Sequence, residues 1–253
     1  MDMDEAVAPE RYPIPPEELR WRSSGERDAK AFLSSGSTAV DFLDREALAR
    51  DGKSLKNFDA ILDFGCGCGR LTRWLRPLTD PWATIHGADA DAAAIEWCKH
   101  NISDASFTLH GDHPPLPFPD NSIDLVLACS VFTQIDAERQ FRWLSELQRI
   151  LKPGGYLLAT FHYRRGIALI ADQSARERVL DDVARHGVAF VAADAGSTGL
   201  PGRPGEAYHA PEYVRRNWGS YFEVRHIVAT GKEEVAVLRA RESTFLQRVF
   251  QRP

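Results

Sequence analysis

Apolar residues between positions 59 and 162 alternate between short continuous runs and stretches with helical spacing. The run IDLVLAC is typical of a strand buried on both faces, whereas residues 136–151 place their large apolar side chains on one side of a helix. By the same criteria we expect strands at 59–64, 82–88, 106–110, 122–129 and 156–162, and further helices at 71–78 and 91–101. Strand and helix alternate with short connections, so the sequence predicts a doubly wound α/β domain with a mostly parallel sheet.

The regions flanking this core have other patterns. Residues 1–16 are acidic and rich in proline, which predicts an extended arm. Residues 17–50 are spaced for short helices, broken near Ser23-Ser24-Gly25 and Ser34-Ser35-Gly36, and are expected to cover the functional site. Lys152-Pro153-Gly154-Gly155 is expected to end the helix before it.

Beyond residue 162 the pattern is looser. We expect a helix at 173–186, a loop at 195–206, a short helix at 211–218 and an antiparallel hairpin over 221–241. The chain is thus divided into an N-terminal arm and helical cap (1–57), a main domain (58–241) and a C-terminal tail (242–253). Residues 163–209 of the main domain are an insertion that is expected to help cover the functional site.

The segment ILDFGCGCGR, residues 61–70, contains a strand that leads into a glycine loop and a helix. Glycines permit a tight turn and a close backbone approach, and a helix N-terminus offers free N–H groups to a ligand. A dinucleotide site has the spacing GxGxxG, but here the spacing is GxGxG, and Arg70 stands where the third glycine would be. Asp63 would repel a pyrophosphate and suits a ligand with an ammonium group.

Two acids follow the second predicted strand. A carboxylate at this position can accept hydrogen bonds from both hydroxyls of a ribose, and Asp89 is our candidate for that role. We interpret Asp91 as the cap of the next helix. The alternative for Asp89 is likewise a cap or turn residue.

The segments ILDFGCGCGR, GADADAAAIEW, LPFPDNSIDLVLACSVFT and ELQRILKPGGYLLAT together resemble the successive motifs of class I (Rossmann-like) S-adenosylmethionine-dependent methyltransferases, over residues 58–162. The predicted C-terminal hairpin is similar to the family's reversed last strand. The resemblance implies S-adenosylmethionine as the cofactor, with its methionine end near Asp63 and the glycines, its ribose at Asp89, its adenine near Asp112 and its sulfonium near Cys129. The full set of cofactor-binding residues it implies is Asp63, Gly65, Cys66, Gly67, Gly69, Asp89, Ala90, Asp112, Cys129 and Ser130.

Catalysis in such a site is mainly approach and alignment, and a base is needed only when the acceptor must lose a proton. His162, at the end of the fifth predicted strand, and His209, before a short helix, are the candidates, with His113 a third. Each is equally well explained as a structural histidine. Arg164 and Arg165 would suit an anionic acceptor, or are simply solvated.

The insertion loosely resembles that of bacterial methyltransferases acting on saccharides or secondary metabolites. We therefore expect O-methylation of a small molecule. N- or C-methylation and a protein acceptor are the alternatives within the enzyme class. An NAD(P)-dependent oxidoreductase and a non-catalytic cofactor-binding protein are more remote.

The composition of the chain limits which classes of binding partner are expected. Acidic residues outnumber Lys and Arg by 36 to 31, giving a net charge of −5, which disfavours a nucleic-acid partner. The four cysteines lack the paired CxxC spacing of a zinc site, so no metal is expected. Neither a signal peptide nor an apolar run of about 20 residues is present, so we expect a cytoplasmic protein without a membrane span. The oligomeric state is left open.

Overall fold

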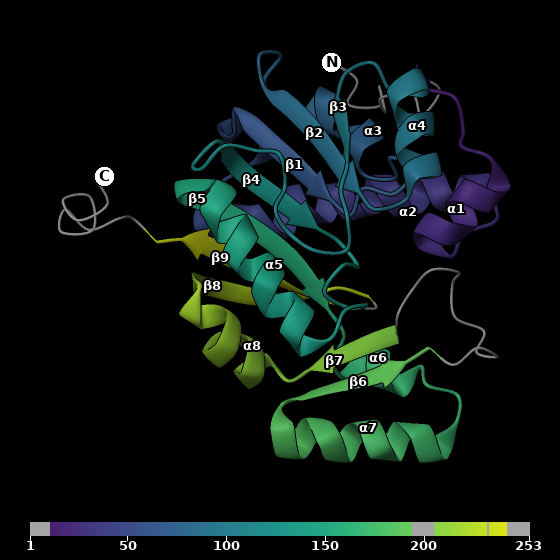
Figure 1. Ribbon diagram of the computed structural model, residues 1–253, viewed down its shortest axis with the longest axis vertical. Helices are drawn as coiled ribbons and strands as arrows, with labels where there is room; N and C mark the ends of the chain where they lie inside the picture. Colours follow the sequence, from purple (N-terminus) through teal and green to yellow (C-terminus); the bar gives the residue numbers. More distant parts are fainter. Residues whose placement is uncertain (1–10, 194–204, 232, 242–253) are drawn as a thin grey trace, which may run out of the picture.

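The computed structural model describes residues 11–193, 205–231 and 233–241. Its centre is a seven-stranded sheet with the order β3-β2-β1-β4-β5-β9-β8, in which only the β5–β9 and β9–β8 pairs are antiparallel (Figure 1). The strands are β1 (Ala60–Phe64), β2 (Thr84–Asp89), β3 (Ser106–Leu109), β4 (Ile123–Ala128), β5 (Leu151–Phe161), β8 (Phe222–Ala229) and β9 (Glu234–Ala240). This confirms the predicted α/β class and the reversed terminal hairpin.

Helices cover both faces of the sheet (Figure 1). One face carries α2 (Ala29–Phe42), α3 (Thr72–Leu75) and α4 (Ala92–Asn101), and the other carries α5 (Ala137–Ile150) and α8 (Pro211–Asn217). In β4, Leu125 and Leu127 belong to one core and Val126 and Ala128 to the other, all with no exposed surface. The continuous apolar run IDLVLAC is therefore explained by burial on both faces.

The insertion after β5 forms a small unit with its own core. It contains α6 (Arg164–Ala168), α7 (Gln173–His186), and the antiparallel pair β6 (Val188–Ala192) and β7 (Gly205–His209). Two backbone hydrogen bonds join β7 to the main domain, from His209 N to His162 O (2.7 Å) and from Ala207 N to Thr133 O (2.8 Å). The insertion is thereby held at the carboxyl end of the main sheet.

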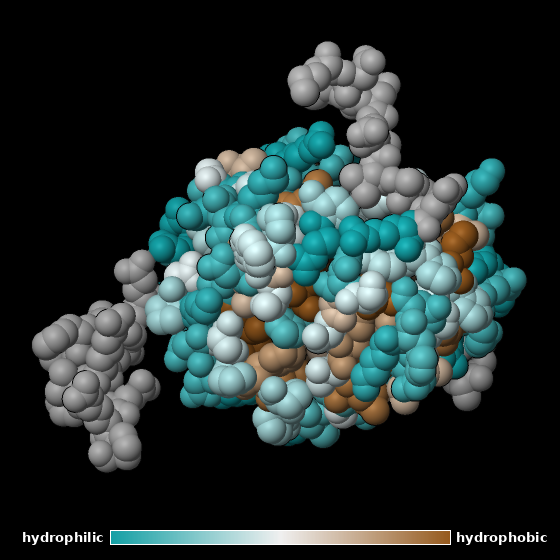
Figure 2. All heavy atoms as spheres, turned by 90° about the horizontal axis from the view of Figure 1, so that it is seen from above, coloured by the Kyte–Doolittle hydropathy of each residue, from teal (hydrophilic) through white to brown (hydrophobic). Residues whose placement is uncertain are grey.

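The remaining helical segments are α1 (Glu17–Ser24), a π-helical turn (Leu43–Ala47), and 3-10 turns at Leu48–Asp51, Leu55–Asn57, Arg76–Leu78 and Trp218–Ser220. Among the described residues, no helix is long and apolar enough to cross a bilayer. Mostly hydrophilic residues cover the face seen from above, with apolar residues gathered near its middle (Figure 2).

The structure corrects three sequence predictions. Helix α2 runs without a break through Ser34-Ser35-Gly36, and the predicted stop at residues 152–155 is already part of β5. Gly36 is buried, and a Cβ built on it would lie 2.3 Å from the carbonyl oxygen of Arg70, so this glycine permits close packing. The pair β6–β7 was not expected, and the predicted loop at 195–206 overlaps its second strand. The predicted arm at 1–10 and tail at 242–253, with loop residues 195–204, lie outside the described residues.

Candidate active site

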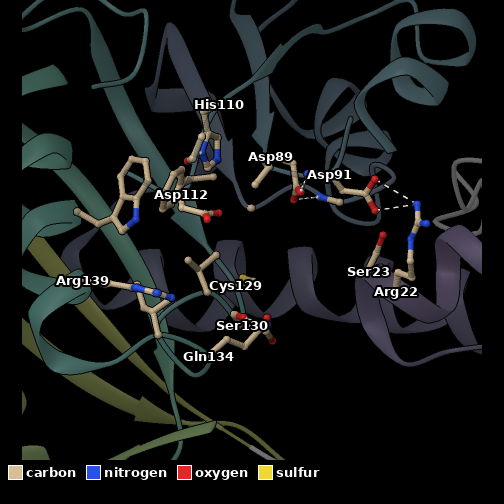
Figure 3. A pocket seen from close by; sticks show the side chains of 18 of the residues that line it. Arg22, Ser23, Asp89, Asp91, His110, Asp112, Cys129, Ser130, Gln134 and Arg139 are labelled. Atoms are coloured by element: carbon tan, nitrogen blue, oxygen red, sulfur yellow. Dashed lines mark hydrogen bonds and ion pairs between the residues drawn. The ribbon is translucent and has the colours of Figure 1, made fainter. Parts of the chain in front are cut away.

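A cavity of about 830 Å³ opens at the carboxyl ends of β1, β2 and β4 (Figure 3). That volume is typical of a small-molecule site, and this edge is where open α/β sheets bind ligands. Its walls come from α1, the loops after the strands and the start of α5: Arg22, Ser23, Phe64, Gly65, Gly67, Asp89, Ala90, Asp91, Ala92, His110, Gly111, Asp112, Cys129, Ser130, Val131, Gln134, Ile135, Arg139 and Trp143.

The glycine loop forms one wall of this cavity. Gly65 and Gly67 have φ values of 76° and 53°, a region that side chains rarely adopt. A Cβ on Gly65 would lie 2.3 Å from Val131 Cγ2, and one on Gly67 would lie 2.6 Å from Ser23 Cβ. Both the backbone conformation and the packing therefore require glycine.

Asp89 ends β2 and is tied to this loop. Its Oδ2 accepts a hydrogen bond from Gly67 N (2.7 Å), and its Oδ1 accepts one from Asp91 N (2.8 Å). Each carboxylate oxygen has a second lone pair, so both can still accept from a ligand. Asp89 thus joins the loop to the cavity and offers two acceptors on the cavity side.

Helix α1 closes the end of the cavity next to α4. Asp91 is the N-cap of α4, as predicted, and pairs with Arg22 of α1 at 2.9 Å. Ser23 Oγ accepts a hydrogen bond from Cys68 N (3.0 Å). Arg22 and Ser23 were not predicted as site residues, because the sequence Ser23-Ser24-Gly25 indicates only the end of a helix.

An aromatic group lines the side beneath β3 and α5. The His110 ring stacks on Phe64 at 5.4 Å between centroids and meets the edge of Trp143 at 5.1 Å, and His110 Nδ1 is 2.7 Å from Gly111 O. These contacts hold the loop that carries Asp112, an exposed residue at the cavity rim. The spacing of the three aromatic residues in the sequence gave no signal of this group.

Ser130 follows β4 in a left-handed conformation with φ 58°. Its N–H donates to Thr160 Oγ1 (2.7 Å), its hydroxyl donates to Glu233 Oε1 (3.0 Å), and its carbonyl accepts from the Gln134 amide. Three contacts thus stabilise a conformation that costs a serine of order 1–3 kcal/mol. Beside it, burial raises the pKa of Cys129 to about 12, so this thiol is neutral at physiological pH.

The sequence-derived cofactor residues divide into two groups. Those that line the cavity are Gly65, Gly67, Asp89, Ala90, Asp112, Cys129 and Ser130. Asp63, Cys66 and Gly69 lie behind the wall instead. Asp63 is 2% exposed, Thr72 Oγ1 donates to it at 2.6 Å, and burial raises its pKa to about 6. Asp63 therefore lies outside the cavity lining, and its role at the methionine end of a cofactor stays a prediction.

Neither histidine proposed as a base lines the cavity. His209 has no exposed surface, its Nε2 contacts the Gln140 amide, and burial lowers its pKa to about 3. It packs against Phe161 and Trp218 as a core residue, away from the cavity lining. His162 is partly exposed and lies against the Tyr208 ring at 5.6 Å. The third candidate, His113, is exposed outside the cavity.

The donor and acceptor set fits S-adenosylmethionine. The glycine loop leaves backbone at the cavity surface where a Cβ would collide, and Asp89 keeps acceptors for a diol. Three of the cavity's five charged side chains are acids, Asp89, Asp91 and Asp112, which suits a ligand carrying a sulfonium and an ammonium group. Among the residues that the structure describes, no group of three or more His, Cys, Asp or Glu side chains could hold a metal ion.

Comparisons with known proteins agree with this geometry. Residues 62–159 match the family described as a methyltransferase domain. A fatty-acid O-methyltransferase of Mycolicibacterium smegmatis is 36% identical over 105 residues, covering 40% of this chain and 36% of that protein. A tRNA N(3)-cytidine methyltransferase of Gallus gallus is 31% identical over 116 residues, covering 43% and 31%. The matches thus span about a third of the length of these relatives.

Solved structures show the same fold. A crystal structure of an S-adenosylmethionine-dependent methyltransferase from Methanosarcina mazei aligns with a TM-score of 0.55 at 21% identity, covering 79% of this chain and all of that one. Residues 62–159 therefore match a methyltransferase domain, and the chain shares the fold of the Methanosarcina mazei methyltransferase. The domain match and the shared fold together favour S-adenosylmethionine as the cofactor.

Proposed function

We propose that the chain is an S-adenosylmethionine-dependent methyltransferase that methylates an oxygen atom of a small molecule. The observation that carries the proposal is the cavity itself, in which the glycine loop, Asp89 and Asp112 line a single space at the carboxyl edge of the sheet. The Mycolicibacterium smegmatis relative is a fatty-acid O-methyltransferase, which supports an oxygen acceptor. Saccharides and secondary metabolites are the acceptors that the sequence favours.

Each wall of the cavity has a distinct role in this proposal. Asp89 would accept from the ribose hydroxyls, Asp112 from the adenine amine, and Gly65 and Gly67 would face the methionine end through their backbones. When bound, the cofactor supplies a methyl group that is already activated by its sulfonium. The protein's contribution is to align the acceptor and exclude water. Ile135 and Arg139 line the part of the cavity that we assign to the acceptor.

A hydroxyl acceptor would require a proton acceptor as well. We retain His162 for that role, since it follows β5 at the carboxyl edge of the sheet and is partly exposed. His209 is not retained, because its burial and its contact with Gln140 leave it no access to the cavity. A carboxylate acceptor would need no base.

The second candidate is N-methylation of a nucleic acid, which is favoured by the Gallus gallus relative, a tRNA N(3)-cytidine methyltransferase. The net charge of −5 weighs against it, because nucleic-acid binding depends largely on neutralising phosphates. We therefore place a small-molecule acceptor first.

Binding and turnover test the proposal in two stages. Titration calorimetry should detect binding of S-adenosylmethionine and S-adenosylhomocysteine but not of NAD. The full chain is then incubated with cofactor carrying an isotope-labelled methyl group and with sugars, phenols, carboxylic acids and total tRNA, and products are identified by mass spectrometry. Binding of NAD without either sulfur ligand would refute the class, and label found only in tRNA would favour the second candidate.

A further inference from the structure

Arg139 carries unused hydrogen-bond donors at the cavity. It lies in the first turn of α5 and points into the cavity beside Gln134 and opposite Asp112 (Figure 3). The described contact of its guanidinium is from Nε to Asp136 Oδ2 at 3.5 Å, while the cap bond from Asp136 goes to the Arg139 backbone. Among the described residues, neither terminal nitrogen of Arg139 has a protein partner. A guanidinium has five N–H donors, so most of those of Arg139 have no protein partner among the described residues.

Other arginines near the site are paired. Arg22, the second arginine of the cavity, makes an ion pair with Asp91 at 2.9 Å. On α5 itself, Arg142 pairs with Glu138, and Arg149 pairs with both Glu146 and Asp120. Arg139 therefore differs from its neighbours in placing a weakly paired cation where the acceptor would bind.

The other titratable groups of the cavity are poorly placed to remove a proton from an acceptor. Asp89 accepts two backbone N–H groups, and Asp91 caps α4 and pairs with Arg22. His110 is packed against two aromatic rings with its unpartnered Nε2 buried, and Asp112 is at the rim. Glu233 accepts the Ser130 hydroxyl from outside the cavity wall. A strong cation without a nearby free base suits an acceptor that arrives already ionised.

We propose that the acceptor is a carboxylic acid, that Arg139 binds its carboxylate, and that the product is a methyl ester. The inference rests on the proposed function and narrows its acceptor class. A carboxyl group with a pKa near 4 is ionised at neutral pH, and guanidinium binds carboxylate through two parallel hydrogen bonds. One carboxylate oxygen forms the bond to the methyl carbon while the carbon–sulfur bond breaks and its electron pair stays on sulfur. The negative charge of the carboxylate and the positive charge of the sulfonium both disappear, and no proton moves.

The first test measures binding, independently of turnover. The full chain is saturated with S-adenosylhomocysteine and titrated with octanoate and benzoate, each paired with its uncharged counterpart, octanol or benzyl alcohol. We expect at least one acid to bind at least tenfold more tightly than its alcohol. Arg139→Gln should remove that preference. Arg139→Lys should keep only part of it, because lysine keeps the positive charge but lacks the two parallel N–H donors of the guanidinium.

The matched control is Arg142→Gln, one turn along the same helix and half exposed, which should leave acid binding unchanged. Affinity for S-adenosylhomocysteine should be the same in all variants. Unaltered acid binding in Arg139→Gln, or no acid preference in the wild-type chain, would overturn the inference while leaving the methyltransferase proposal intact. Failure of the wild-type chain to bind S-adenosylhomocysteine would instead refute the proposed function.

The second test follows the product. With S-adenosylmethionine present, mass spectrometry should detect methyl octanoate or methyl benzoate, at a rate at least tenfold lower in Arg139→Gln. The wild-type rate should vary little between pH 6 and 9, because a carboxylate needs no base. Methyl ethers formed from hydroxyl acceptors, with no esters, would contradict the assignment.

Discussion

Replacing Asp89 with alanine tests how one carboxylate serves both the glycine loop and the cofactor. Its two oxygens accept hydrogen bonds from the backbone of Gly67 and Asp91 at 2.7 and 2.8 Å, and their remaining lone pairs face the cavity. The change would thus remove the loop's anchor together with the proposed ribose acceptors.

The expected magnitudes follow from these contacts. A hydrogen bond to a charged group contributes about 1.5–3 kcal/mol, and water replaces part of it because Asp89 is only half buried. We expect the dissociation constant for S-adenosylhomocysteine to rise at least tenfold, or about 1.4 kcal/mol. The ligand-free protein should also lose about 1–3 kcal/mol of unfolding free energy.

Calorimetry and urea denaturation measure the two effects separately. Asp112→Ala is the control, because Asp112 lines the cavity at its exposed rim, so its loss should weaken binding without lowering stability. If Asp89→Ala lowers stability but leaves the dissociation constant unchanged, the carboxylate supports the loop only. The ribose assignment would then be wrong.

Three further changes probe residues in the cavity wall and behind it. The pKa of Asp63 is about 6 in the folded state against an ordinary 3.8, so its ionisation lowers the stability of the fold, and the full loss is reached above pH 6. Asp63→Asn should therefore be more stable than wild type by about 3 kcal/mol at pH 8. Chemical denaturation should show this gain vanish towards pH 4. Gly67→Ala introduces a Cβ at φ 53°, so it should weaken cofactor binding at least tenfold when measured by calorimetry. Gly231→Ala is the control and should leave cofactor binding unchanged, because a Cβ there would have no atom within 4 Å. His209→Ala should lower the unfolding free energy by roughly 2–4 kcal/mol, because it opens a buried space and removes the described partner of Gln140 Oε1. A large loss of turnover at unchanged stability would instead support a role for His209 as a base.

Local patterns predicted most of the parallel sheet. The run at β4 indicated burial on both faces, and the glycine spacing after β1 indicated a turn into a helix, because both signals depend on residues close in sequence. The acid after β2 was placed at the cavity for the same reason. The family resemblance then implied the cofactor.

Contacts between distant residues were not predictable in this way. Gly36 reads as a helix breaker, but it lies inside α2 because the Arg70 backbone packs against it. Ser23 and Arg139 enter the cavity only through the packing of α1 and the position of α5. His209 resembled a loop residue until β7 placed it against Gln140 and Trp218. For Gly36, Ser23 and His209, one deciding neighbour (Arg70, Cys68 and Gln140, respectively) lies more than 30 positions away in the chain.

Strand β9 has a consequence for synthesis on the ribosome. It lies between β5 and β8, and Val235 to Leu238 are fully or almost fully buried there. The order of translation therefore differs from the order of assembly, since β5 keeps an unpaired edge until residues 234–240 have left the exit tunnel. An unpaired edge can associate with another chain. A nascent chain of this protein depends on late residues to close its sheet, and it is exposed to aggregation or chaperone capture until they emerge.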